Sequence, residues 1–153
     1  MKTVSIDELG AVFAQALSEI ITKVSGFSFD VLSEKDDTSF DECVALMSLN
    51  SIRGGVLFIS AEESCLRVLC SYMVGIPEVD INKTDIEDVL CELVNMTAGN
   101  AKLHLNDTEY MFSLSLPFII NGTGLSITAK KRANIISRTL GSGDVSVKLK
   151  VVY

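Results

Sequence analysis

The sequence has no tryptophan, only two prolines and a single histidine, His104, among its 153 residues. It also has no apolar run near the roughly 18 residues that a membrane-spanning helix needs. Its first ten residues, MKTVSIDELG, lack the basic and apolar regions of a secretory signal. No low-complexity tract interrupts a composition that is 48% hydrophobic, which is typical of a well-packed globule. These absences predict a cytoplasmic protein that does not contact a membrane and folds as one domain over residues 1–153.

Few side chains are available to bind a metal ion. The cysteines lie inside apolar runs and form no CxxC pair; they are Cys43, Cys65, Cys70 and Cys91. With one histidine in the chain, a zinc site would need more ligands at closer spacing. We therefore expect no metal site and four buried, free thiols.

The charge balance also narrows the choice of partner. The net charge of −7 disfavours nucleic-acid binding, which requires lysine and arginine concentrated on one face. The one basic run, residues 130–132, is short and predicts a solvated turn. An acidic surface suits a protein partner with exposed lysines.

Hydrophobic periodicity predicts a mixture of helices and strands. Ser5 with Glu8, and Thr84 with Glu87, have the spacing of capping boxes at helix starts. The predicted helices are residues 6–23, 61–75 and 84–105. The predicted strands are residues 27–32, 42–49, 55–59, 110–116, 125–129, 135–140 and 145–152. Strand–turn–strand pairs with intervening helices predict an α/β (α+β) sandwich, with an antiparallel or mixed sheet and long helices packed on one face.

A faint internal repeat accompanies this pattern. Residues 54–61, GGVLFISA, resemble residues 123–129, TGLSITA, and each copy follows a helix and an earlier strand. The chain is therefore predicted to consist of two weakly related halves.

The predicted helix 84–105 carries two different faces. Apolar residues recur at steps of three and four and form a stripe that needs a core. The remaining side carries what we call the polar strip, which consists of Asp88, Glu92, Asn95, Gly99 and Lys102. A glycine in a helix interior costs roughly 1 kcal/mol relative to alanine and would let another molecule approach the backbone. The residues alone leave open whether the polar strip is a binding face or only a solvated one.

A longer pattern includes a proline beyond the helix. Asp88, Glu92, Asn95 and Pro117 reproduce the spacing D/S-x3-E-x2-N-x21-P. This spacing, together with residues 92–102 and 113–117, resembles the CheC/CheX/FliY family of chemotaxis phosphatases. The length of the chain and its single Glu-x-x-Asn resemble the CheX branch.

The resemblance implies hydrolysis of the phosphoaspartate of a CheY-like response regulator. Asn95 would orient the attacking water and Glu92 would pair with a lysine of the regulator. Asp88 and Gly99 would contact the partner, and Pro117 would shape the end of a strand. The Mg²⁺ ion would be bound by the regulator and no cofactor by this chain.

CheX relatives form homodimers, and the resemblance therefore implies a dimer, with a sheet edge near the C-terminal strands as the expected contact. Two other functions remain open. The first is a flagellar-switch-like module that binds the phosphorylated regulator without hydrolysing it. The second is a purely structural dimerising domain, although that function would leave the polar strip without a role.

Overall fold

A computed structural model describes residues 1–35, 37–130 and 132–153. Lys131, in the middle of the predicted basic turn, lies outside these described residues. The helices are α1 (Ile6–Ser25), α2 (Glu63–Val74), the short 3-10 helix η1 (Glu78–Asp80) and α3 (Lys83–Leu105). The strands are β1 (Asp30–Ser33), β2 (Cys43–Asn50), β3 (Gly55–Ala61), β4 (Ser113–Asn121), β5 (Ile135–Ser142) and β6 (Val145–Val152).

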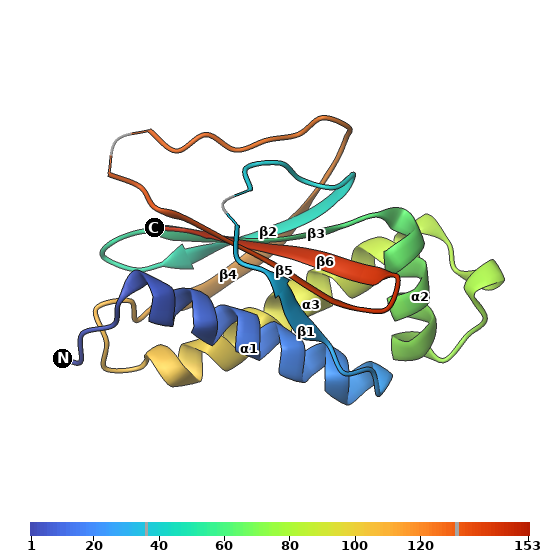
Figure 1. Cartoon of the computed structure of the whole chain (residues 1–153), viewed down its shortest axis with the longest axis horizontal. Coiled ribbons are helices and arrows are strands. Elements are labelled where there is room, and N and C mark those ends of the chain that lie inside the picture. Colours follow the sequence, from blue (N-terminus) through green and yellow to red (C-terminus); the bar gives the residue numbers. More distant parts are fainter. Residues whose placement is uncertain (36, 131) are drawn as a thin grey trace.

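The strands form one sheet with the order β1-β5-β6-β3-β2-β4, and every pairing between them is antiparallel. The long helices α1 and α3 run antiparallel to each other across one face of this sheet, and α2 packs beside them (Figure 1). The predicted α+β class, with long helices on one face, is confirmed, and the sheet is antiparallel. No helix within the described parts of the chain is long and apolar enough to cross a membrane.

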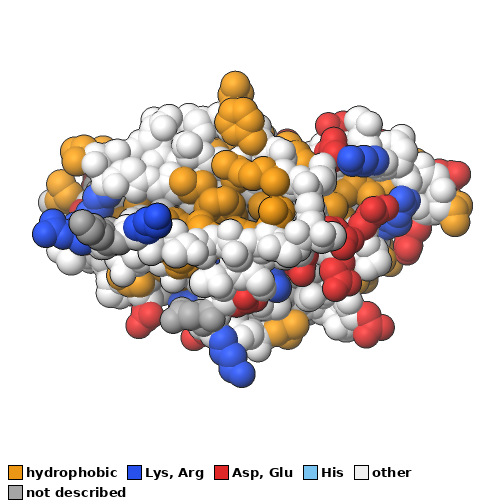
Figure 2. Space-filling view, turned by 90° about the horizontal axis from the view of Figure 1, so that it is seen from above, with side chains coloured by type: hydrophobic (Ala, Val, Ile, Leu, Met, Phe, Trp, Pro, Cys, Tyr) orange, Lys and Arg blue, Asp and Glu red, His pale blue; other side chains and the backbone are white. Residues whose placement is uncertain are grey.

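Irregular chain covers the other face of the sheet (Figure 1). Phe40 N donates a hydrogen bond to the carbonyl oxygen of Leu125 at 2.9 Å, so two covering segments meet above the strands. Beneath them Lys150 is fully buried and donates to Ser137 Oγ at 3.0 Å. Figure 2 looks onto this face and shows apolar side chains gathered in a hollow. A recess of about 160 Å³ here is lined by Phe40, Val44, Phe58, Ile120, Leu125, Ser126 and Ile127.

The core lies between the sheet and the helices. The sequence builds α1 with the predicted capping box, in which Ser5 and Glu8 bond each other's backbone N–H groups, and ends it at Gly26 in the left-handed conformation. Its apolar stripe is buried against α3 and β5. The buried residues of α3 are Ile86, Val89, Leu90, Leu93, Val94, Thr97, Ala98, Ala101 and Leu105.

The start of α3 differs from the prediction. The helix begins at Lys83, and its capping box joins Asn82 to Asp85 instead of Thr84 to Glu87. The Asp85 N–H donates to Asn82 Oδ1 and the Asn82 N–H donates to Asp85 Oδ2, each at 2.9 Å. Asparagine accepts from the first turn at least as well as threonine, which explains the earlier start.

Two predicted strands are displaced. The prediction at 27–32 was early, because Phe29 is buried and its carbonyl accepts a hydrogen bond from Ser18 Oγ, so pairing begins only at Asp30. The prediction at 110–116 was early as well. Tyr110 packs edge-on to Tyr153 in a turn, and β4 begins at Ser113.

The predicted strand at 125–129 was wrong. These residues form only an isolated bridge, Ser39 with Ser126, and Leu125 and Ile127 lie over the helix-free face of the sheet. Their alternating pattern reflects this covering position and not membership of a ladder. The two copies of the proposed repeat therefore do not occupy equivalent strands.

The predicted dimer contact is a sheet edge near the C-terminal strands, and the strand order shows which strands form the edges. Strands β5 and β6 lie inside the sheet, and the outer strands are β1 and β4. The outer edge of β4 is unpaired among the described residues. On its helix-free side β4 exposes three apolar side chains: Leu116, Phe118 and Ile120.

The cap of α3 gives a direct test of its start. We expect Asn82→Ala to lower the free energy of unfolding by about 1 kcal/mol, because it leaves the Asp85 N–H without its acceptor. Thr84→Ala should change it by less than about 0.5 kcal/mol, because Thr84 is exposed and caps nothing. Urea unfolding followed by circular dichroism measures both. A larger loss from Thr84→Ala than from Asn82→Ala would contradict the observed cap.

Candidate functional site

The polar strip lies along one side of α3, as the helical spacing predicts. Asp88 and Glu92 are exposed, and Asn95, Gly99 and Lys102 are half-buried. Glu92 and Asn95 are separated by three residues, which corresponds to about 4.5 Å along a helix axis. A single partner group can therefore contact both side chains.

The polar side-chain groups of Asp88, Glu92 and Asn95 are available for a partner. Within residues 1–35, 37–130 and 132–153, the side chains of Asp88, Glu92 and Asn95 make no hydrogen bond or ion pair. The neighbouring Glu87, by contrast, accepts from Asn121 Nδ2 at 3.1 Å and lies 3.7 Å from Lys83 Nζ. The strip thus differs from the adjacent face of the same helix, where the charges already have partners.

The opposite side of α3 holds the strip in place. Leu93, Val94 and Ala98 surround the position of Asn95 on the helix and are fully buried. A half-buried asparagine between such residues has little freedom to move its backbone. The amide of Asn95 is therefore presented by a rigid element.

Pro117 lies on β4, where it pairs with Met47 of β2. Met47 is part of the buried core on the helix side, so Pro117 also faces the helix layer. The ladder shifts register between Met47 and Leu49, next to this proline. A proline is tolerated here because β4 is an edge strand and the ladder is already irregular. Pro117 therefore lies in the middle of β4 and not at a strand end as predicted, and it places no reactive group at the strip.

Neither packing within the chain nor backbone conformation requires a glycine at position 99. A Cβ atom built there meets no atom within 4 Å, and the residue lies inside an α-helix where φ is ordinary. Beside it, α1 contributes Glu19 and Lys23 to a groove between the two long helices. Sequence reasoning missed these α1 residues; the available signal was an oppositely charged pair spaced four apart on an exposed helix face.

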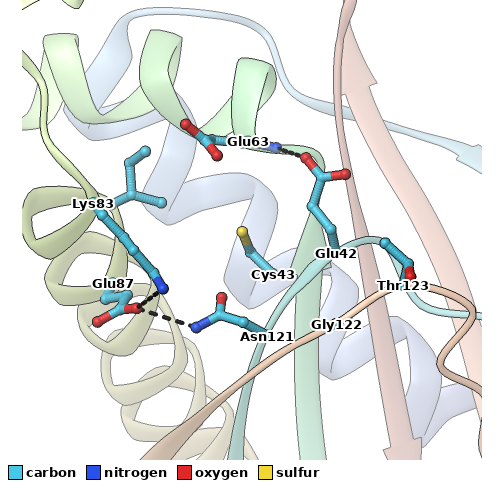
Figure 3. Close-up of a pocket in the computed structure, with 9 residues that line it drawn as sticks. Glu42, Cys43, Glu63, Lys83, Glu87, Asn121, Gly122 and Thr123 are labelled. Atoms are coloured by element: carbon cyan, nitrogen blue, oxygen red, sulfur yellow. Dashed lines mark hydrogen bonds and ion pairs between the residues drawn. The ribbon is translucent and has the colours of Figure 1, made fainter.

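A separate recess of about 280 Å³ lies at the first turn of α3 (Figure 3). Its polar groups bond to one another. Glu42 Oε1 accepts from the Glu63 N–H at 2.8 Å and so caps α2, while Glu87 holds Asn121 at the end of β4. We interpret this recess as a junction that fastens the ends of α2, α3, β2 and β4.

The thiols are free, as predicted, but two are not fully buried. Cys65 and Cys70 are buried, whereas Cys43 and Cys91 are half-buried. Burial raises the pKa of the Cys91 thiol, and the carboxylates of Asp88 and Glu87 raise it further. Cys91 therefore stays a neutral, weakly polar neighbour of Glu92. In the part of the chain that the structure describes, no group of three or more potential ligands is placed to hold a metal ion, and His104 is exposed near the end of α3.

Known proteins share the fold of this chain. The family described as chemotaxis phosphatase CheX matches residues 43–140. The solved CheC-like superfamily protein from Shewanella sp. PV-4 has a TM-score of 0.82 at 21% identity, covering 97% of this chain and 98% of that one. The chemotaxis protein CheX from Vibrio vulnificus has a TM-score of 0.80 at 20% identity, covering 94% and 97%.

A third solved structure contains a partner. It is the CheX-CheY-BeF3-Mg²⁺ complex from Borrelia burgdorferi, with a TM-score of 0.70 at 15% identity, covering 93% of this chain and 94% of that one. No curated protein matches the chain. At these identities the solved structures establish the fold.

Gly99 allows a stability test that is independent of any partner. We expect Gly99→Ala to raise the free energy of unfolding by up to about 1 kcal/mol, because alanine favours the helix and its Cβ meets nothing. Thermal unfolding measures the change. As a control, Gly10→Ala should destabilise, because a Cβ at Gly10 would lie 2.7 Å from Ile136 Cγ2. A loss of stability in Gly99→Ala would show that the glycine serves internal packing.

Proposed function

Since the chain belongs to the CheX family of chemotaxis phosphatases, we propose that it hydrolyses the phosphoaspartate of a CheY-like response regulator. The observation that carries the proposal is the pair Glu92 and Asn95. Both side chains lie on the outer side of α3 without a partner among the described residues. The rest of the helix is anchored in the core, so this pair can enter a cleft on another protein without unfolding its support.

Asn95 acts by positioning a water molecule. An acyl phosphate is already labile and its hydrolysis passes through a loose transition state, so catalysis depends mainly on an in-line water and on electrostatics. The carboxamide of Asn95 can donate one hydrogen bond and accept another, which fixes a water in two directions. It needs no ionisation for this task.

Glu92 anchors the regulator. It lies one helical turn before Asn95, on the same side, and its carboxylate pairs with a lysine beside the phosphorylated aspartate. A desolvated, charge-assisted bond of this kind contributes about 1.5–3 kcal/mol. Asp88 adds a second negative charge one helical turn before Glu92. Gly99, one turn after Asn95, leaves space for the partner's surface.

The divalent ion belongs to the substrate. The solved Borrelia complex contains CheX, CheY, BeF3 and Mg²⁺. For this chain we propose that Mg²⁺ is bound by the regulator and that the phosphatase supplies Glu92 and Asn95.

The alternative is a regulator-binding module without hydrolysis. Such a module needs Asp88 and Glu92 for contact but has no use for a carboxamide at position 95. The presence of Asn95 three residues after Glu92 therefore favours the phosphatase.

We also propose a homodimer, formed through the outer edge of β4. Leu116 and Phe118 on this strand are 75% and 61% exposed, next to unpaired backbone groups. Antiparallel pairing of β4 with its copy is self-complementary, as a two-fold interface requires. Because α3 presents the polar strip on the helix layer, pairing through the strand edge leaves Glu92 and Asn95 accessible.

The roles of Glu92 and Asn95 can be separated by substitution. We expect Asn95→Ala to lower the rate of dephosphorylation by about 100-fold or more while affinity for the regulator is retained, because only water positioning is lost. Glu92→Ala should weaken affinity by about 10- to 100-fold as well as slow the reaction. The measurements are phosphate release from an Mg²⁺-loaded phosphorylated CheY-like regulator, and binding to its BeF3 form.

The matched control is Asn106→Ala, an exposed asparagine at the end of the same helix, which should leave both properties unchanged. Equal turnover by the wild type and Asn95→Ala would overturn the mechanism. Binding without turnover by the wild type would favour the non-hydrolysing module.

The dimer has its own test. We expect the wild type to sediment at about twice its chain mass of 16.6 kDa, and Phe118→Asp to sediment as a monomer, because a charge is placed in the apolar contact. Leu32→Asp, on the opposite edge strand β1, is the control and should remain dimeric. A wild type that stays monomeric at all concentrations in sedimentation equilibrium would contradict the proposed contact.

A further inference from the structure

A groove of about 460 Å³ runs between α1 and α3 on the helix layer. Its α1 wall consists of Glu19, Ile20 and Lys23, and its α3 wall includes Met96, Gly99 and Leu103. Gly99 contributes no side chain to the groove, and a Cβ atom built there meets no atom within 4 Å. The groove is separate from the recess at the start of α3.

The chemistry of the groove is apolar at its floor and charged at its rim. Ile20 is 6% exposed and Met96 is half-buried, so they form the floor. Leu103 also lines the groove and is 73% exposed, so its side chain is accessible to a partner. This arrangement suits an apolar side chain flanked by polar groups.

The two charges on the rim differ in their bonding. The Glu19 carboxylate accepts from Gln15 Nε2 at 2.8 Å and from Asn100 Nδ2 at 3.5 Å, so its position is fixed within the chain. Lys23 makes no ion pair with any residue the structure describes. The rim therefore offers one cation that is free to meet a carboxylate of a partner.

The groove is continuous with the polar strip. Gly99 belongs to both, and it lies one helical turn after Asn95. A protein that covers Asn95 and approaches Gly99 must also extend over the adjoining groove. Residues of the groove and the strip thus face one partner at the same time.

We infer that this groove binds an apolar side chain of the same response regulator and thereby sets the affinity with which the regulator docks beside Asn95. The inference rests on the proposed function for the identity of the partner. The other candidate is a second copy of this chain, which has a separate apolar contact available at the outer strand β4, on the sheet face opposite the helices. The groove acts through binding alone, so it affects the concentration at which the regulator saturates the enzyme and not the chemical step.

The test compares Leu103→Asp with Leu32→Asp, a matched change at a leucine that is 60% exposed on β1. We expect Leu103→Asp to raise the KM for the phosphorylated regulator, and the Kd for its BeF3 form, by about tenfold with kcat unchanged. Leu32→Asp should leave all three unchanged. Leu103→Ala, a milder change, should raise both constants by about threefold, and circular dichroism shows whether each variant is folded.

The outcomes separate this inference from the proposed function. Unchanged KM and Kd in folded Leu103→Asp would overturn the inference that the groove binds the regulator, even if the wild type is an active phosphatase. A wild type that binds the BeF3 form of the regulator without turnover would overturn the proposed phosphatase activity. The Kd of Leu103→Asp would still show whether the groove binds the regulator. Loss of self-association in Leu103→Asp, with regulator binding intact, would assign the groove to a second copy and overturn the inference.

Discussion

Burial of the apolar stripe of α3 against the sheet and the neighbouring helices determines what the opposite side of this helix can present. Leu90, Leu93 and Leu105 are at most 1% exposed, and burying such a side chain contributes about 1.5–3 kcal/mol each. Their sum is comparable to the whole net stability of a domain. The helix cannot shift along its axis without losing this contribution, so Glu92 and Asn95 keep a fixed spacing and direction before any partner arrives.

The two contact surfaces proposed for the molecule lie on different layers. The polar strip and the groove beside it belong to the helix layer, whereas Leu116, Phe118 and Ile120 of β4 point away from the helices. Self-association and regulator binding therefore do not compete for the same residues. The recess at the first turn of α3 has neither role, because Glu42 and Glu87 are already bonded to neighbouring elements.

Much of this fold could be predicted because local signals agree with burial. The Ser5–Glu8 capping box, the Gly26 stop and the buried stripe of α3 all follow from short-range spacing. The wrong predictions concern segments whose structure depends on contacts between residues far apart in the sequence. Leu125 and Ile127 alternate like a strand but lie over the sheet, and nothing local shows that β5 and β6 end up inside it. The strip was predictable from one helix, whereas the groove required knowing that α1 lies beside α3.

The position of Asn95 well inside a 23-residue helix limits what this surface can offer. Around Asn95 the backbone N–H groups are consumed by carbonyls four residues earlier, so none is left to stabilise an anionic phosphoryl oxygen. The nearby carboxylates of Asp88 and Glu92 cannot do so either. In the proposed complex, charge stabilisation then comes from the regulator, with its own metal ion and lysine. Each complex would be a composite active site in which the substrate contributes the electrophilic half, so one such chain would process different regulators at intrinsically different rates.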